Sequence, residues 1–350
     1  MRLSICIPTY NFGAFIGETL QSILPQLEDG VEVVVLDGGS TDDTTAVVES
    51  FQRQYASLRY ERRDERGGID RDIARVVDLA EGEYCWLFCA DDLMKPGAIR
   101  RMLQNLDTGC DVYLCGMTLC TLDMRRLAEH RVSKIKVESQ FDLALAHDRQ
   151  AYFKRALTTT AFFSFASSLT FKKSRWDAIG LDEEFVGSLW AHVARFFQMI
   201  PGGLRLHYLP ESYLFKRTEN DSFADKGLVH RYSIAIDGYH RLAHTHFPVE
   251  SLEAQHIRRA VRNEFPPWLL LRLKFTSERD RPEDVSSVDR LAAKAYVDRT
   301  PRNLIYHSIY KYTPRALLRA AQATYRPVRS ISISIRALRC RDLLATTNRT

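Results

Sequence analysis

Apolar residues follow two different patterns along the N-terminal part of the chain. Residues 31–36 read VEVVVL, a nearly continuous apolar run of the kind that is buried on both faces of a parallel sheet. Residues 15–26 instead place apolar side chains, among them Ile16, Leu20 and Ile23, at the spacing of one helix face. The same patterns predict further strands at 3–7, 58–61 and 84–89, and further helices at 44–55 and 70–80. Strands that alternate with helices indicate βαβ units and a largely parallel sheet.

Polar residues come directly after three of the predicted strands, namely Tyr10, Asn11, Asp37 and Asp91. The carboxyl ends of parallel strands meet at one edge of a sheet, and ligands of such sheets bind at that edge. We therefore expect these side chains to face one crevice.

The pattern changes along the rest of the chain. It predicts a helix up to Leu106, strands at 110–120, 161–172 and 204–217 with an interruption at Pro210, and a helix within 181–199. Residues 121–151 are charged and mixed, and support no assignment. Strand signals stop near residue 223, and residues 228–274 and 286–325 predict helices. The expected fold class is α/β: a Rossmann-like, mainly parallel sheet flanked by helices over residues 1–225, then a helical region over 226–350.

Composition narrows the class of protein. Of 350 residues, 45% are hydrophobic and 27% charged, which suits a globular protein with a sizeable core. The net charge of +5 suits phosphate-bearing ligands, but no nucleic-acid-binding module accompanies it, so no nucleic-acid partner is expected. No apolar run approaches the ~20 residues of a membrane span, and the N-terminus does not resemble a signal peptide. Seven cysteines without a C-x-x-C spacing are expected to be buried thiols of a cytoplasmic protein.

Four segments, in order and spacing, resemble the nucleotide-sugar-dependent glycosyltransferases of family 2. They are SICIPTYNFGAFIGETLQSIL (4–24), VVVLDGGSTDDT (33–44), GGIDRDIARVVDLAEGEYCWLFCADD (67–92) and GLDEEF (180–185). The resemblance covers residues 3 to about 222. Residues 67–92, and GSLWAHVARFF (187–197), are most similar to abequosyltransferase-type enzymes of O-antigen synthesis.

The resemblance implies the GT-A fold and an inverting, metal-dependent enzyme of the hexosyltransferase type. Such an enzyme moves a sugar from a nucleoside diphosphate sugar to a saccharide acceptor. An acceptor carried on a lipid is expected, in the synthesis of lipopolysaccharide or another surface polysaccharide.

The resemblance also implies a site for a divalent cation, Mn²⁺ or Mg²⁺. Asp91 matches the metal-binding Asp of the family, and Asp92 is its expected helper; the cation would neutralise the leaving diphosphate. Family members often carry Asp-x-Asp here, but Cys89 stands in place of the first Asp, which leaves the number of protein ligands open. Alternatively the two carboxylates cap the next helix, although capping explains one Asp better than two.

The donor-binding residues that the resemblance implies are Pro8, Thr9, Tyr10, Asn11, Asp37, Asp70, Arg71, Asp91, Lys216 and Arg217. Asp37 matches the family residue that hydrogen-bonds the nucleoside, and Gly38 removes a second carboxylate that many members carry. Arg71 would lie near the diphosphate, and Lys216 and Arg217 would clamp it. A turn-forming role for Asp37, an exposed ion pair for Arg71 and a solvated loop at 216–217 are the alternatives.

The catalytic base is the main departure from the family. Members usually place Glu-Asp at the start of the helix that follows G-x-x-D-E, but Ser188 and Leu189 stand there. His192 lies one turn further on, and an imidazole is a competent base near neutral pH. His192 could instead bind metal or pack in the core. Asp182 and Glu184 are the alternative bases.

Residues 301–350 contain ten basic residues and one acidic residue, Asp342, with aliphatic and aromatic residues interleaved. This pattern favours a helix on an anionic membrane face, which would place a cytoplasmic enzyme at the inner surface of the membrane. A subunit contact in an oligomer and a solvated tail are the alternatives.

Two other functions fit parts of the sequence. A non-catalytic scaffold that binds nucleotide sugars would explain the missing Glu-Asp, but not the retained Asp37, Asp91 and Asp92. A nucleotidyltransferase would carry a Gly-rich basic loop after the first strand, where this chain has Pro8, Thr9, Tyr10 and Asn11.

Overall fold

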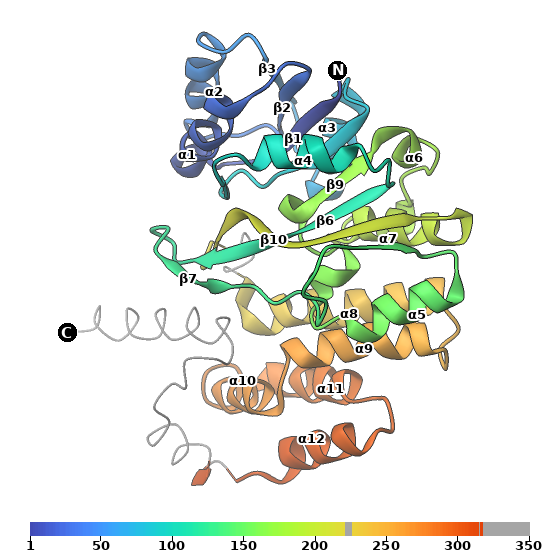
Figure 1. Ribbon diagram of the computed structural model, residues 1–350. Helices are drawn as coiled ribbons and strands as arrows, with labels where there is room; N and C mark the ends of the chain where they lie inside the picture. Colours follow the sequence, from blue (N-terminus) through green and yellow to red (C-terminus); the bar gives the residue numbers. More distant parts are fainter. Residues whose placement is uncertain (221–225, 315, 318–350) are drawn as a thin grey trace, which may run out of the picture. The chain divides into compact units, whose positions relative to one another are not determined.

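The computed structural model describes residues 1–220, 226–314 and 316–317 (Figure 1). The chain forms two compact units. Residues 1–155 and 160–218 make up the N-terminal unit; residues 156–159 and the chain from residue 219 make up the C-terminal unit. Residue 225, where the sequence predicts a boundary, lies outside the described residues.

The N-terminal unit contains one ten-stranded sheet, and four neighbouring strands of it run parallel in the order β3-β2-β1-β4. These strands are β1 (Leu3–Thr9), β2 (Val31–Asp37), β3 (Leu58–Arg62) and β4 (Tyr84–Leu87). β2 is buried along its whole length, as the VEVVVL run predicts. The connecting helices are α1 (Gly13–Ile23), α2 (Thr44–Gln52) and α3 (Ile69–Leu79). Because the strands are parallel, the carboxyl ends of β1, β2 and β4 share one edge of the sheet.

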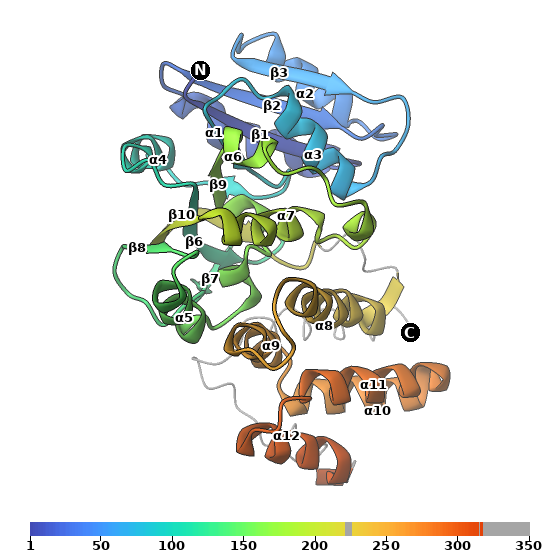
Figure 2. The same ribbon diagram turned by 90° about the vertical axis from the view of Figure 1, so that its right-hand side faces the viewer.

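Beyond β4 the sheet is mixed, and its order continues β9-β6-β10-β5. β9 (Leu169–Lys172) is antiparallel to β4 and to β6 (Val112–Cys120), whereas β10 (Arg205–Arg217) is parallel to β6. Figures 1 and 2 show β6 and β10 next to each other. Three short strands complete the sheet. β10 pairs with β5 (Leu93–Met94) and with β8 (Ser139–Asp142), and β6 pairs with β7 (Arg126–Glu129). Helices α4 (Ala98–Leu106), α5 (Ala146–Arg155), α6 (Lys173–Asp177) and α7 (Ala191–Met199) complete the unit.

Two predicted strands differ from those observed. Of residues 161–172, only Leu169–Lys172 form a strand; residues before them form 3₁₀ turns, with Phe163 between the turns in a left-handed conformation (φ 68°). The interruption expected at Pro210 is absent, since β10 runs through it. Proline cannot donate a ladder hydrogen bond, and the pairing with β6 shifts register between Leu209 and Ser212.

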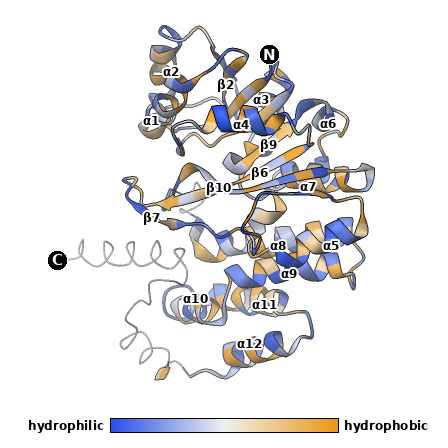
Figure 3. Cartoon of the chain, viewed as in Figure 1, coloured by the Kyte–Doolittle hydropathy of each residue, from blue (hydrophilic) through white to orange (hydrophobic). Residues whose placement is uncertain are grey.

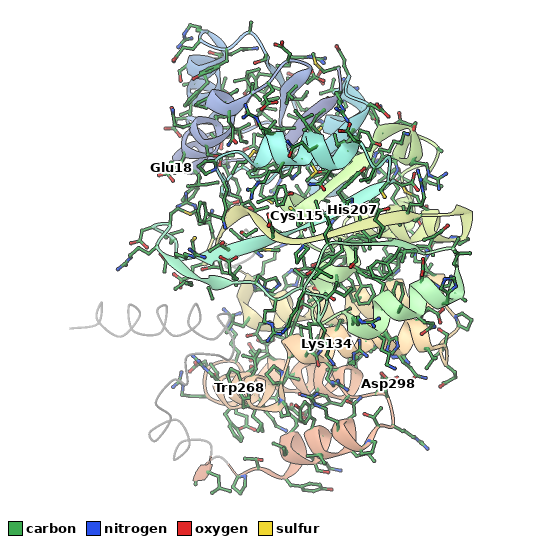
Figure 4. All side chains as sticks on the ribbon, viewed as in Figure 1. Glu18, Cys115, Lys134, His207, Trp268 and Asp298 are labelled. Atoms are coloured by element: carbon green, nitrogen blue, oxygen red, sulfur yellow. The ribbon has the colours of Figure 1, made fainter. Side chains whose placement is uncertain are left out.

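The C-terminal unit is helical. Its helices are α8 (Gly227–His246), α9 (Leu252–Glu264), α10 (Pro267–Asp280), α11 (Val285–Ala295) and α12 (Pro301–Tyr312). The side chains of Ser251 and Thr300 cap α9 and α12. Arg258 forms a buried ion pair with Asp298, which is labelled in Figure 4. Within the described ranges, no helix has the length and apolar character needed to cross a bilayer.

Candidate active site

The loops that follow β1 and β2 are hydrogen-bonded to each other. The Asn11 backbone N–H donates to Ser40 Oγ at 2.8 Å, and Asn11 Oδ1 accepts the Thr41 N–H at 2.8 Å. Asn11 has a φ of 56°, a conformation that Asn adopts more readily than most residues. The Thr9 carbonyl accepts the Gly38 N–H at 2.8 Å, and an arginine side chain, Arg66, lies over the Tyr10 ring at 4.2 Å. The predicted residues 8–11 and Asp37 are thus brought together at one edge of the sheet.

Asp37 is fully buried and both its oxygens have protein partners. Oδ1 accepts the Ser40 N–H at 2.7 Å, and Oδ2 accepts the Tyr60 hydroxyl at 2.8 Å. These bonds hold the turn after β2. The nucleoside contact of Asp37 stays a prediction.

Three possible ligand groups follow β4. Cys89 Sγ and a carboxylate oxygen from each of Asp91 and Asp92 lie within 4.8 Å of one another. Asp92 is buried; its Oδ2 accepts the Ser167 hydroxyl at 2.6 Å, and its Oδ1 accepts the Arg217 N–H at 3.0 Å. Burial and then the Asp91 charge raise the pKa of Asp92 to about 7. Asp91 is partly exposed, so it offers the more accessible carboxylate of the pair.

Lys216 and Arg217, at the end of β10, lie beside this cluster in different ways. The Lys216 ammonium lies 4.3 Å from the centre of the Phe165 ring, and its charge lowers the pKa of Asp92 against the larger effect of burial. Arg217 is buried: its Nε donates to the Asp91 carbonyl at 2.9 Å, and its Nη2 pairs with Glu18 at 2.5 Å (Figure 4). Arg217 therefore ties β10 to the chain after β4, and Lys216 is the more available cation.

Asp70 and Arg71, at the start of α3, contact the segment that leads into α7. The buried Asp70 carboxylate accepts backbone N–H groups from Gly187 (2.8 Å), Leu189 (3.0 Å) and Ala191 (3.2 Å). Arg71 pairs with Glu183 through two hydrogen bonds of 3.1 and 2.6 Å in an exposed position. Both side chains thus hold residues 183–191 in place, and their predicted contact with the donor stays untested.

His192 lies in the first turn of α7 and is buried. Among the described residues, neither ring nitrogen has a hydrogen-bond partner of normal geometry. Burial lowers the pKa of His192 to about 4, against a smaller opposing effect of the Phe163 backbone. The imidazole is therefore neutral at pH 7, with both ring nitrogens buried away from solvent.

The two alternative bases are placed differently. Asp182 Oδ1 accepts the Glu184 N–H at 3.0 Å, and its Oδ2 accepts the Gln198 side chain at 2.8 Å. These bonds cap the turn before α7. Glu184 is exposed.

Left-handed backbone conformations occur close to these groups. In the N-terminal unit, non-glycine residues with positive φ are Asn11, Met124, Phe163 and Leu189. Met124 lies in the turn between β6 and β7, but Asn11 follows β1, Leu189 lies three residues before His192, and Phe163 packs against Phe196 and Phe197 of α7. A left-handed backbone at a bulky residue such as Phe or Leu costs about 1–3 kcal/mol, and it persists only where the surrounding structure enforces it. Such conformations often occur at functional sites.

Two residues at this edge, Ser167 and Asp72, were not predicted from the sequence. Ser167 accepts the Cys89 N–H at 2.9 Å and donates to Asp92, so it links the turn before β9 to the chain after β4. Asp72 lies where a side chain at position 38 would lie: a Cβ on Gly38 would be 2.8 Å from Asp72 Oδ2. An isolated serine gives no signal for such a role, but Asp72 stands in the same GGIDRDI motif as Asp70.

Comparison with known proteins agrees with this geometry. Residues 4–174 match the family model described as Glycosyl transferase family 2. The chain is 31% identical over 294 residues to abequosyltransferase RfbV of Salmonella typhimurium. The aligned region covers 82% of this chain and 88% of the relative. The chain belongs to glycosyltransferase family 2. The predicted family and the similarity to abequosyltransferases are confirmed, and the protein is a glycosyltransferase.

Solved structures show the same fold for this family 2 chain. S. aureus TarS 1-349 in complex with UDP-GlcNAc has a TM-score of 0.60 at 18% identity, over 92% of this chain and 88% of TarS. A mannosyltransferase, PcManGT from Pyrobaculum calidifontis, in complex with GDP-Man and Mn²⁺, has a TM-score of 0.54 at 19% identity, over 94% and 82% of the two chains. The GT-A type of sheet, with a helical C-terminal region, is confirmed.

Proposed function

We propose that this family 2 glycosyltransferase transfers a sugar from a nucleoside diphosphate sugar to a saccharide acceptor, with inversion and with help from a divalent cation. The observation that carries this proposal is the pair Asp91 and Asp92 beside Lys216, at the edge where β1, β2 and β4 end. A weaker similarity, 25% identity over 55% of this chain, to a Campylobacter jejuni glucosyltransferase named for its undecaprenol-linked acceptor favours an acceptor carried on a lipid.

The side chains present suit a hard divalent cation. Burial, and then the negative charge of Asp91, raise the pKa of Asp92, and a bound cation would offset the second of these effects. Mn²⁺ and Mg²⁺ prefer oxygen ligands, which Asp91 and Asp92 supply. Burial raises the pKa of the thiol of Cys89, the third candidate ligand. Its sulfur is therefore neutral and is a poor ligand for these ions. When bound, the cation would neutralise charge on the leaving diphosphate. PcManGT holds Mn²⁺ in a similar fold.

The protein side chains would divide the remaining work between donor and acceptor. Lys216 would hold the diphosphate from the β10 side, and the loops after β1 and β2 would hold the nucleoside. We propose His192 as the base that takes the proton of the acceptor hydroxyl, because its ring nitrogens make no hydrogen bond of normal geometry with a described residue, while each oxygen of Asp182 already accepts one.

A donor screen tests the proposal. Melting temperatures would be measured with UDP-, GDP-, CDP- and dTDP-sugars, each with Mn²⁺, Mg²⁺ or EDTA, in wild type and Asp91→Ala. We expect one nucleotide class to raise the melting temperature only with metal, and Asp91→Ala to lose that rise. An increase that is equal with EDTA, or no increase with any donor, contradicts the metal-dependent mechanism.

The role of His192 has a separate test. His192→Gln should lower turnover about a hundredfold, in the range expected for a lost general base, while donor affinity stays unchanged. Near-normal turnover in that variant would exclude His192, and Glu184→Gln would then be measured.

A further inference from the structure

Helix α12 exposes its apolar residues. Leu304 is 59% exposed, Ile305 58%, Ile309 42% and Tyr312 70%. The apolar residues Val297, before the helix, and Leu317, after it, are also more than half exposed. A short helix that turns four large apolar side chains outward leaves a surface that water solvates poorly.

The four exposed apolar residues lie on one side of α12, which also carries the exposed Ser308. A residue advances about 100° around an α-helix, so Leu304, Tyr312, Ile305 and Ile309 together span an arc of about 140°. Asn303 and Tyr310 lie on the opposite side and are buried: Asn303 accepts a hydrogen bond from Arg262 of α9, and Tyr310 donates one to Asp289 of α11. Figure 3 shows that α12 carries both hydrophobic and hydrophilic residues. The helix is thus amphipathic with its apolar side outward, the reverse of the usual arrangement.

The charges around this side are all positive. On the same helical projection Lys311 and Arg302 lie at the two edges of the apolar arc, about 20° beyond it on each side. Both are exposed, and Pro301–Tyr312 contains no acidic residue. In sequence, residues 313–350 add eight arginines against the single acid Asp342.

We propose that the α12 face, defined as Leu304, Ile305, Ile309 and Tyr312 with Arg302 and Lys311 at its edges, docks on the surface of an anionic phospholipid bilayer. An apolar side that enters the headgroup region, with basic side chains at its edges that reach lipid phosphates, is the arrangement of interfacial helices. Pairing this face with the same face of a second copy would bring basic edges together, which is unfavourable. The inference deepens the proposed transfer to a lipid-linked acceptor, since it places the enzyme on the membrane that would carry the acceptor.

Vesicle co-sedimentation of the full chain tests the proposal. The vesicles would be phosphatidylcholine alone, or phosphatidylcholine mixed with phosphatidylglycerol. The test variant is Leu304→Gln/Ile305→Gln. The matched control is Val249→Gln/Leu252→Gln, because these residues are 50% and 55% exposed in the same unit. We expect wild type and control to bind the anionic vesicles, and the test variant to bind at least tenfold more weakly. Binding should also weaken as salt rises.

Two further measurements make each outcome decisive. If the test variant does not fold, Arg302→Gln/Lys311→Gln replaces it, and that variant should lose the preference for anionic vesicles. Donor hydrolysis without vesicles should be equal in all folded variants, so failure of membrane docking is distinguished from failure of the proposed chemistry. Equal vesicle binding by wild type and test variant overturns the proposal. So does a wild-type dimer that the Gln substitutions convert to a monomer in light scattering.

Discussion

The donor side and the acceptor side of the candidate site are built in different ways. The donor side, by which we mean the ends of β1, β2 and β4, is carried by regular strands whose order follows from local sequence pattern. The proposed acceptor side, residues 160–192, is largely irregular and is fixed by buried polar contacts with other segments: Asp70 of α3 accepts N–H groups of residues 187–191, and Ser167 donates to Asp92. One side is therefore positioned by the sheet itself, and the other by a few buried polar contacts. Substitutions on the two sides should fail in different ways.

On the donor side, Asp91→Ala should have the largest effect. Loss of the accessible carboxylate should lower turnover about a thousandfold, equivalent to about 4 kcal/mol of transition-state stabilisation. Turnover would be measured over a range of Mn²⁺ concentrations. The melting temperature without ligand should change little, because β4 keeps its pairing.

The control for this substitution is Asp123→Ala, an exposed aspartate that pairs with Arg125 in the turn before β7. It should leave both turnover and metal dependence unchanged. A metal response retained in Asp91→Ala would move the cation site away from Asp91.

On the acceptor side, Asp70→Ala should act through the loop that it holds. Three charge-assisted hydrogen bonds are lost, so we expect kcat to fall about tenfold or more while the dissociation constant of the donor stays unchanged. Steady-state kinetics with varied acceptor, and calorimetry with donor, would measure the two quantities. Acceptor orientation should be affected because Gly187, Leu189 and Ala191 lead directly into His192.

Arg71→Gln is the neighbouring control, since its pair with Glu183 is exposed and solvent-screened. It should change little. The opposite result for Asp70→Ala, weaker donor binding with normal acceptor kinetics, would restore the donor-facing role that the sequence suggests.

The same contrast explains what the sequence could predict. Strands such as β2 are buried on both faces, so the apolar run alone marks them, and the polar residues after them must lie at the sheet edge. The parallel part of the sheet and the place of Asp91 and Asp92 at its edge followed from such local patterns, whereas the GT-A fold followed from the resemblance to family 2. The partners of those residues did not, because Asp92 meets Ser167 and Arg217, which are 75 and 125 positions away in sequence.

Residues 161–168 show the limit most clearly. Their aromatic and small residues have high strand propensity, yet Phe163 adopts a left-handed conformation and the segment forms turns. Tertiary packing overrides propensity here: the rings of Phe162 and Phe163 lie against Phe197 and Phe196 of α7. Asp70 illustrates the same point, since its place in a motif predicts importance but not which side of the site it serves.

A smaller effect, on the melting temperature, is expected at Gly38, where the proposed donor side departs from the family pattern. Gly38→Ala would bring a Cβ to 2.8 Å from Asp72 Oδ2 and 3.5 Å from the Thr9 carbonyl. Such overpacking costs about 1–3 kcal/mol, which corresponds to a fall of a few degrees in melting temperature. Asp72→Ala in the same chain should recover part of the loss. A double-mutant cycle measures this coupling, and strictly additive effects would contradict the assignment of that space to Asp72.

The comparison also leads to a pH dependence that arises from Asp92. Its pKa is about 7 in the folded protein, against a usual value of about 3.9 for an unfolded chain. The folded state therefore binds more protons between these pH values, so this group makes the free energy of unfolding fall as pH rises from about 4 to about 7. Asp92→Asn should flatten that slope in chemical denaturation, and Asp107→Asn, an exposed site, should not.

Because a cation binds the ionised carboxylate, the rise in melting temperature caused by Mn²⁺ should grow over the same interval in wild type and should not grow in Asp92→Asn. A Mn²⁺ effect independent of pH would mean that Asp92 supports the site only through Ser167 and Arg217, and that Asp91 alone meets the metal.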